Sequence, residues 1–318
     1  MPAPPPLPRA VLDGPFTSAH AASLGLSEKV LRGQRFRRLH PRVWVHVDRA
    51  LTQEDRIRAA ELALPSRAQV SHVTRIQRLG LDILDAEPLH FTIAGELHLA
   101  LEGIRLHRTK VLPPLDDVGV TPAAAFVQMC ADVRLIDAVI VGDWLLHRRH
   151  MSVAEVADLA RRDHWRPGAH QVLAVLPHLD AGAESPKESE TRAVLVFAGL
   201  PRPEVNANVV NPHGVLLGRG DLVFRLWKLL VEYEGRHHLT LVDQWNRDID
   251  RYGGFRDDGW DYIQVTNEKL GRPKKLVSEV YGHLVRRGFD GPAPVFGPRW
   301  ASLFSVIPAQ MAVSRRPR

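Results

Sequence analysis

The chain has 318 residues, and this length favours two or three domains because single hydrophobic cores seldom grow past ~250–300 residues. Its composition, 45% hydrophobic and 25% charged, is that of an ordinary globular protein, and its net charge of +6 favours a polyanionic partner such as nucleic acid. The single cysteine, Cys130, excludes an intramolecular disulfide framework and a cysteine-rich zinc site, which favours a reducing compartment.

The sequence gives no indication of a membrane segment or a secretion signal. No stretch approaches the ~18–20 continuous apolar residues of a membrane span, and the N-terminus lacks an apolar signal core. We therefore expect a cytoplasmic protein with no membrane partner. Residues 1–10 hold enough prolines to prevent regular structure, and we expect them to form a flexible leader.

Residues 11–50 have the pattern of a small winged helix-turn-helix. Thr17 and Ser27 can each cap a short helix, Gly25 separates the two helices, and residues 38–47 predict a strand of the following hairpin. Five arginines and no acidic residue lie between positions 32 and 42: Arg32, Arg35, Arg37, Arg38 and Arg42. Such a run can neutralise several phosphates of DNA or RNA. The alternative is a solvated loop beside a compact helical hairpin.

This stretch also resembles a known family. The motifs FTSAHAASLGLS and LRGQRFRRLHPRVWV are similar to the N-terminal domain of the AbiEi-type antitoxin and transcriptional-regulator family. The resemblance covers the winged-helix stretch only. It implies a domain that binds promoter DNA, and it makes a cognate toxin a candidate partner.

Residues 51–180 predict a middle α+β domain. Apolar residues at helical spacing after a cap at Thr52 indicate a helix over 51–64, and a second helix ending at Gly80, a series of strands and turns, and three more helices follow. Asp143 lies within an apolar helix and is interpreted as a buried carboxylate with an arginine partner. A catalytic role is disfavoured for four polar residues of this domain, since lone His and Arg side chains are more often exposed or structurally satisfied: His72, Arg75, His107 and Arg108.

The polar stretch 180–189 marks a boundary with a C-terminal domain, residues 185–290, that contains a predicted β-hairpin. A turn centred between Leu226 and Trp227 sets Asp221 opposite Glu232, with Cβ atoms ~4.5–5.5 Å apart. Glu234 shares the face of Glu232 because side chains alternate along a strand. Carboxylates this close repel one another unless a cation lies between them, and a hard divalent ion is the natural candidate.

The elements around the hairpin predict an α/β core with a mixed sheet, since a helix and a strand precede the hairpin and a helix, a strand and a helix follow it. Glu190 is expected in the first turn of the preceding helix. The helix dipole favours a carboxylate there, so an acid at this position can also be explained by helix stability alone, without a role in a site.

Five motifs of the C-terminal domain resemble a nuclease family when they are taken in order: SETR, GRGDLVF, VEYEGRHH, QWNRDIDR and GWDYIQVT. They are similar to the very-short-patch-repair-endonuclease-like domain of unknown function that is often fused to AbiEi-type N-termini. That domain is a branch of the PD-(D/E)xK nuclease superfamily. The resemblance therefore implies a restriction-endonuclease-like core.

The resemblance also implies roles for individual residues. Glu190 corresponds to the helical acid of the core, Asp221 to the metal-binding Asp, and Glu232 to the first acid of the (D/E)xK tail. The superfamily's Lys falls at Glu234, which could serve as a general base or be held structurally by Arg219.

Further ligands and supporting residues follow from the same resemblance. The main-chain carbonyl of Tyr233 is implied as a metal ligand beside Asp221 and Glu232. Supporting positions near the metal end are implied for three polar residues: His238, Gln244 and Asp248.

The sequence as a whole predicts a multidomain protein of α+β and α/β architecture, with a winged helix, a middle α+β domain and an endonuclease-like core. The expected function is metal-dependent hydrolysis of DNA phosphodiester bonds with Mg²⁺ or Mn²⁺ as the cofactor. The alternative is a non-catalytic, antitoxin-type transcriptional regulator with a degenerate nuclease fold. Residues 291–318 show no usable periodicity and are expected to form a disordered tail.

Overall fold

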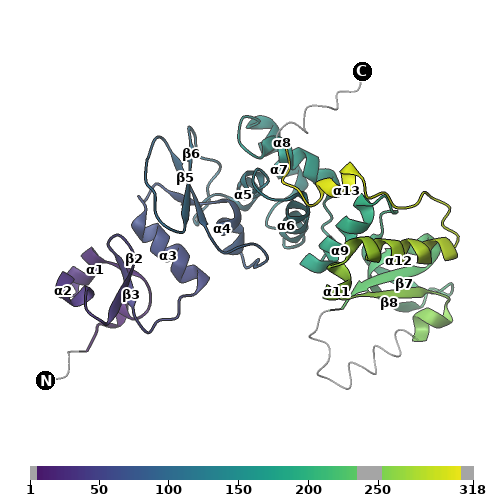
Figure 1. Cartoon of the computed structure of the whole chain (residues 1–318), viewed down its shortest axis with the longest axis horizontal. Helices are drawn as coiled ribbons and strands as arrows, with labels where there is room; N and C mark the ends of the chain where they lie inside the picture. Colours follow the sequence, from purple (N-terminus) through teal and green to yellow (C-terminus); the bar gives the residue numbers. More distant parts are fainter. Residues whose placement is uncertain (1–5, 235–252, 309–318) are drawn as a thin grey trace. The chain divides into compact units, whose positions relative to one another are not determined.

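The computed structural model describes residues 6–234 and 253–308. They form a multidomain α+β protein in which helices surround three small sheets (Figure 1), and this confirms the predicted fold class. The chain divides into two compact units, residues 1–125 and 126–318. The division falls inside α5 (Pro122–Met129) and not at 180–189, because α6 (Leu135–His147) packs against α9 (Pro186–Phe197) across that polar stretch.

The first unit begins with the elements of the predicted winged helix. In chain order they are β1 (Phe16–Thr17), α1 (Ser18–Ser23), α2 (Glu28–Leu31), β2 (Phe36–His40) and β3 (Val43–His46). Thr17 caps α1 by accepting a hydrogen bond from the His20 N–H at 3.1 Å, and Gly25 turns the chain with φ of 79°. Ser27 occupies the predicted cap position of α2, but its side chain makes no capping hydrogen bond.

Two details of this region correct the sequence predictions. The strand expected over 38–47 is a hairpin, because Arg42 adopts φ of 64° and turns β2 back onto β3. The leader expected over 1–10 ends in ordered structure, since η1 (Arg9–Val11) places a fully buried Val11 in the local core.

The second sheet of this unit has two different faces. It consists of β4 (Gln69–Val70), β5 (Leu89–Ala94) and β6 (Ile104–Thr109) in the order β4-β5-β6, with β5 and β6 parallel. Leu89 and Phe91 pack with α3 (Gln53–Ala63) in one apolar cluster. Because side chains alternate along a strand, His90 and Thr92 face the other way, and α4 (His72–Gln77) contacts β5.

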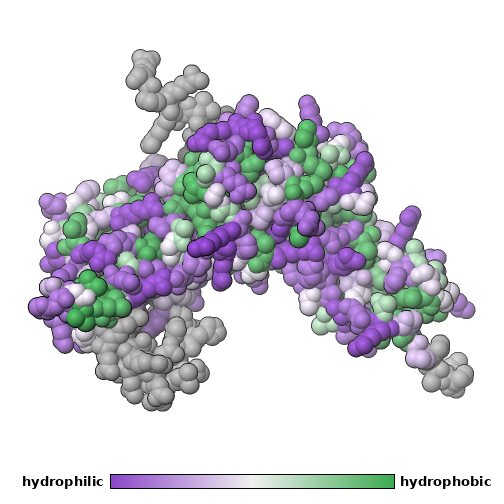
Figure 2. All heavy atoms as spheres, turned by 180° about the vertical axis from the view of Figure 1, so that it is seen from behind, coloured by the Kyte–Doolittle hydropathy of each residue, from purple (hydrophilic) through white to green (hydrophobic). Residues whose placement is uncertain are grey.

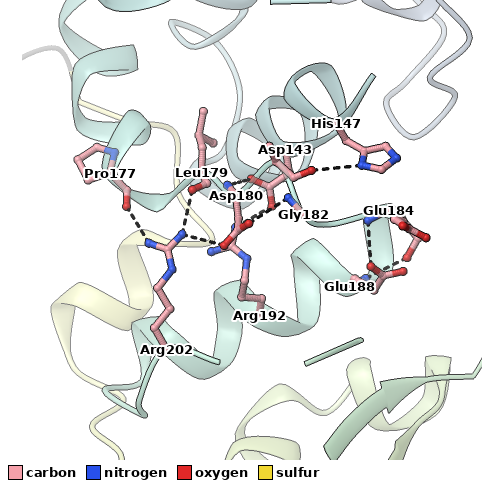
Figure 3. A network of polar contacts seen from close by, with 12 residues as sticks. Asp143, His147, Pro177, Leu179, Asp180, Gly182, Glu184, Glu188, Arg192 and Arg202 are labelled. Carbon is pink, nitrogen blue, oxygen red and sulfur yellow. Dashed lines mark hydrogen bonds and ion pairs between the residues drawn. The ribbon is translucent and has the colours of Figure 1, made fainter. Parts of the chain in front are cut away.

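The first half of the second unit is helical. After α5 and α6 come α7 (Val153–Arg162), α8 (Ala169–Val175), η2 (Leu176–His178) and α9. The Asp143 side chain on α6 is fully buried and pairs with Arg192 on α9 at 2.6 Å, while a second oxygen accepts the Asp180 N–H (Figure 3). Burial raises the pKa of Asp143 against the opposing effect of Arg192. The predicted arginine partner of Asp143 is confirmed.

The second half of this unit holds the third sheet. Its strands are β7 (Glu204–Val210), β8 (Leu216–Phe224), β9 (Leu229–Tyr233) and β10 (Asp261–Val265). The order is β10-β9-β8-β7, with β9 and β10 parallel and the other pairs antiparallel, so the predicted mixed sheet is confirmed. α9 and α12 (Pro273–Arg286) pack against β9, and α11 (Asn267–Leu270) follows β10 (Figure 1).

The tail expected to be disordered is structured as far as residue 308. α13 (Pro298–Ser302) packs on α9, where the buried Trp300 donates its indole N–H to the Val194 carbonyl at 3.3 Å. Phe296 and Phe304 flank Trp300 in edge-to-face contacts. These aromatic residues recur every four positions, which is helical spacing, so burial of the rings orders the segment.

The surface of the protein is mainly polar. Hydrophilic side chains cover much of the face shown in Figure 2, and they interrupt the apolar areas. Among the described residues, none of the helices combines the length and the apolar character that crossing a bilayer requires.

Candidate metal centre

The hairpin between β8 and β9 has the register predicted from its turn. η3 (Arg225–Trp227) and Lys228, with φ of 44°, reverse the chain. The Lys228 ammonium group donates to the Asp258 carbonyl at 2.7 Å and so ties the turn to the loop before β10. The ladder then pairs three residues of each strand: Phe224 with Leu229, Val223 with Leu230, and Leu222 with Val231. It ends one residue before Asp221 and Glu232.

Asp221 and Glu232 lie next to the last pair of this ladder, one on each strand. The Tyr233 N–H donates to Asp221 Oδ2 at 2.9 Å, so this carboxylate binds the main chain directly beside Glu232. Gly220 precedes Asp221 in the sequence, and a Cβ atom added to this glycine would lie 3.8 Å from Glu232 Oε1. That Cβ atom would also meet Leu230 Cδ2 at 2.7 Å and Val223 Cγ2 at 3.0 Å, so a larger residue at position 220 would require these side chains to shift.

Glu232 is buried, with 6% of its surface exposed. Its Oε2 accepts a long hydrogen bond of 3.4 Å from the Tyr262 hydroxyl, and Gln264 is its partner on β10 in the parallel register. Phe255 and Trp260 belong to the apolar cluster beside this part of the sheet. A carboxylate buried in such surroundings and next to a second acid favours a bound cation. The sequence analysis did not single out Tyr262 and Gln264, which gain meaning only from the pairing of β9 with β10.

Glu234 lies just beyond β9. Its N–H donates to the Val265 carbonyl at 2.8 Å and extends the contact between β9 and β10. Arg219, the proposed structural partner of Glu234, instead forms an ion pair with Glu184 and donates its Nε–H to the Asn206 carbonyl at 2.9 Å. The structure therefore does not pair Arg219 with Glu234.

The predicted position of Glu190 in the first turn of its helix is wrong. α9 begins at Pro186, with Ser185 accepting the Glu188 N–H as its cap. Glu190 therefore lies in the second turn, where it pairs with Lys187 at 2.7 Å and its side chain is 26% exposed. A better sequence signal was present, because Ser-Pro-Lys-Glu over 185–188 has the spacing of a capping box with proline at the first helical position.

Glu188 is the acid of α9 that contacts the sheet. It is buried, and its Oε2 accepts hydrogen bonds from the Asn206 side chain on β7 at 2.6 Å and from the Glu184 N–H at 3.0 Å (Figure 3). Asn206 adopts φ of 50°, a backbone conformation that asparagine tolerates better than most residues. Through Asn206, Glu188 is linked to Arg219 on β8.

Charged side chains of both signs line a hollow of about 270 Å³ beside the end of β10. Lys269 pairs with Glu279 at 2.8 Å and Arg272 with Glu268 at 3.3 Å, and Lys275 adds a further positive charge. The Tyr233 hydroxyl donates to Asn267 at 2.8 Å, so the end of β9 contacts the start of α11, the helix that carries Lys269. The predicted supporting residues lie outside the described part of the chain: His238, Gln244 and Asp248.

The predicted DNA-binding arginines line α2 and the hairpin of the first unit. All are exposed except Arg35, which is half-buried. Arg32 pairs with Glu28 at 2.7 Å, and Arg37 donates to the Arg49 carbonyl at 2.8 Å. Arg38 and Arg42 extend this basic surface along β2 and its turn.

The fold and the site define a multidomain α+β protein with paired acids in the mixed sheet of its second unit. No family model matches the chain. It is similar to two uncharacterized proteins of Mycobacterium tuberculosis, from strains CDC 1551 and H37Rv. Each is 24% identical to it over 256 residues, which cover 79% of this chain and 94% of the relative.

Proposed function

We propose that this protein is a metal-dependent DNA endonuclease. In this proposal Asp221 and Glu232 hold Mg²⁺ or Mn²⁺, and the arginines of the first unit bind DNA. The observation that carries it is the register of the hairpin, which pairs Leu222 with Val231 and so places Asp221 and Glu232 at adjoining positions of the two strands. Carboxylate oxygens are the ligands that hard divalent ions prefer, and the main-chain carbonyl of Tyr233 is the proposed third ligand.

The protein's own groups position the two acids for this chemistry. The Tyr233 N–H holds one oxygen of Asp221, and the Tyr262 hydroxyl holds one oxygen of Glu232. A bound ion would supply an activated water and neutralise the charge that develops on the phosphate. We assign Glu234 as the candidate general base, since it lies two residues beyond Glu232 at the end of β9.

Two further features support the same proposal. Glu188, in place of Glu190, is the proposed helical acid because it is the residue of α9 that contacts β7. The hollow near the end of β9 has one more basic than acidic side chain, since Lys269 pairs with Glu279 and Arg272 with Glu268 while Lys275 adds a further positive charge. Phosphate groups on either side of the cleaved bond could bind there.

Cleavage assays with purified full-length protein test the proposal. Single-stranded, double-stranded and mismatched DNA are incubated with Mg²⁺ or Mn²⁺ and with wild type, Asp221→Ala or the control Asp257→Ala, which removes an exposed acid of the same unit. We expect Asp221→Ala to lower the cleavage rate at least ~10²-fold, because charge stabilisation by a metal is worth several kcal/mol. The control should cleave like wild type.

The same material separates the two functions left open by the sequence. Asp221→Ala should bind DNA with wild-type affinity, since it lies outside the basic surface of the first unit. If wild-type protein binds DNA but cleaves none of the substrates with either metal, the non-catalytic regulator is the better description.

The DNA-binding surface has a test of its own. Changing Arg35, Arg37 and Arg38 together to Ala should weaken DNA binding and flatten its dependence on salt, because each lost phosphate contact lowers the slope of log K against log salt by ~0.9. Fluorescence anisotropy at several salt concentrations measures this slope. An unchanged slope would remove these arginines from the interface.

A further inference from the structure

Three histidines of the first unit converge on one face of its second sheet. His72 begins α4, His90 lies on β5 and His107 lies on β6. The His107 ring stacks on His72 with centroids 3.7 Å apart, and its Nε2 lies 3.0 Å from Nδ1 of His90. One ligating nitrogen from each ring lies within 4.8 Å of the other two.

The pairing of β5 with β6 explains why these rings meet. In the parallel register Thr92 is the partner of His107, and His90 lies two residues earlier on the same face of β5. The opposite face is filled by the apolar cluster that packs with α3, so the polar side chains are confined to the side of α4. His72 and His90 are buried as a result.

A network of hydroxyl groups orients the His72 ring. Its Nδ1 lies 2.9 Å from the Ser71 hydroxyl, which also accepts a hydrogen bond from Thr92 at 2.8 Å. The Ser71 oxygen can accept a second hydrogen bond, and when Nδ1 donates it, Nε2 is the nitrogen that can ligate. Such an outer hydrogen bond is typical of metal-bound histidine.

The backbone at His72 is held in an uncommon conformation. Its φ of 51° lies in the left-handed region, which residues with a large side chain rarely adopt. Strain of this kind costs on the order of 1–3 kcal/mol and clusters at functional sites. Here it directs the imidazole of His72 onto His107.

We propose that His72, His90 and His107 form a binding site for a borderline divalent transition metal, with Zn²⁺ as the best fit. Zinc accepts three imidazole ligands and leaves a fourth position for water or another ligand. Zn–N bonds of ~2.0–2.1 Å place tetrahedral ligands ~3.3–3.4 Å apart. Nε2 of His107 lies 3.0 Å from Nδ1 of His90, and one nitrogen of each ring lies within 4.8 Å of the other two. For all three nitrogens to face one ion, the stacked rings of His72 and His107 must turn out of their parallel arrangement and the hydrogen bond between His90 and His107 must open.

A charged residue on β6 neighbours the cluster. Arg105 is the partner of His90 in the sheet and brings a positive charge that opposes a cation. Replacing Arg105 with Gln should therefore tighten metal binding.

Metal titration of the full-length protein tests the site. After treatment with a chelator and dialysis, the protein is titrated with Zn²⁺ by calorimetry and with Co²⁺ by visible absorption, which reports tetrahedral coordination. We expect wild type to bind one more equivalent than His72→Asn, a substitution that removes the imidazole and tolerates positive φ. His213→Asn, which removes an exposed histidine between β7 and β8, should bind like wild type.

Two further variants separate the loss of the metal site from the loss of the fold. His107→Gln should lose the same equivalent while circular dichroism shows a retained fold, and Asp221→Ala should keep it, because that acid lies in the other unit. The proposal is overturned if wild type binds no Zn²⁺ at micromolar concentration, or if folded His72→Asn and His107→Gln keep the wild-type stoichiometry. The three rings would then be a hydrogen-bonded network without metal.

Discussion

The acids of the third sheet and the histidines of the second sheet are two proposed metal sites that differ in their ligand atoms. Asp221 and Glu232 offer carboxylate oxygens from two adjacent strands, and such oxygens are the preferred ligands of a hard ion such as Mg²⁺. His72, His90 and His107 offer nitrogen from a helix and two parallel strands, which suits a borderline ion such as Zn²⁺. The two sheets therefore differ in ligand chemistry, and each can be tested without disturbing the other.

The largest expected effect comes from a buried acid that belongs to neither cluster. Asp143→Ala should lower the free energy of unfolding by about 3–5 kcal/mol, because it leaves Arg192 buried without its ion-pair partner. Urea denaturation measures the change. Asp158→Ala, which removes an exposed ion pair with Arg161, should cost well under 1 kcal/mol. Equal losses in the two variants would contradict the structural role given to Asp143.

A second test uses His178, a half-buried histidine outside the cluster. Burial lowers the pKa of His178 to about 4, and three arginines add to the effect. The unfolded chain takes up a proton near pH 6.5 and the folded chain only near pH 4, so stability falls as the pH drops between these values. The loss should be on the order of 2 kcal/mol, since the ring is only partly buried.

Denaturation at several pH values measures the contribution of His178. His178→Gln should flatten the fall in stability between pH 6.5 and pH 4, whereas His213→Gln, at an exposed position, should leave it as in wild type. A His178→Gln variant with the wild-type pH dependence would show that another group is responsible.

The smallest of these effects concerns the choice between two acids of α9. Glu188→Gln should lower Mg²⁺-dependent cleavage by about tenfold, or ~1.4 kcal/mol in the barrier, because Glu188 contacts the sheet. Glu190→Gln should have little effect, since Glu190 pairs with Lys187 on the helix. The reverse order would restore Glu190 as the helical acid of the site.

The register of the hairpin could be predicted from the sequence because one short turn joins its two strands. The turn at 225–228 fixes the pairing of Leu222 with Val231, the last pair before Asp221 and Glu232. Local signals also predicted helix starts correctly, as Thr17, Thr52 and Ser152 each accept the expected capping hydrogen bond. These features depend on residues close together in the chain.

The histidine cluster could not be predicted in this way. His90 and His107 meet only because β5 and β6 are parallel and in one register, and His72 joins them from α4. Two other predictions were wrong because of one residue each, namely the start of α9 and the turn between β2 and β3. The capping sequence at Ser185 was passed over and Glu190 was chosen, and the turn at Arg42 was missed because a positive φ at arginine has no sequence signal.

Binding of Mn²⁺ tests the central claim most directly, because it requires neither a DNA substrate nor turnover. Electron paramagnetic resonance reports free Mn²⁺ as it is titrated into full-length wild type, Asp221→Asn and Glu232→Gln, each in a His72→Asn background that removes the histidine cluster. We predict that the parent protein depletes free Mn²⁺ and that both acid variants leave it in solution. Equal depletion by all three proteins would contradict a metal centre at Asp221 and Glu232.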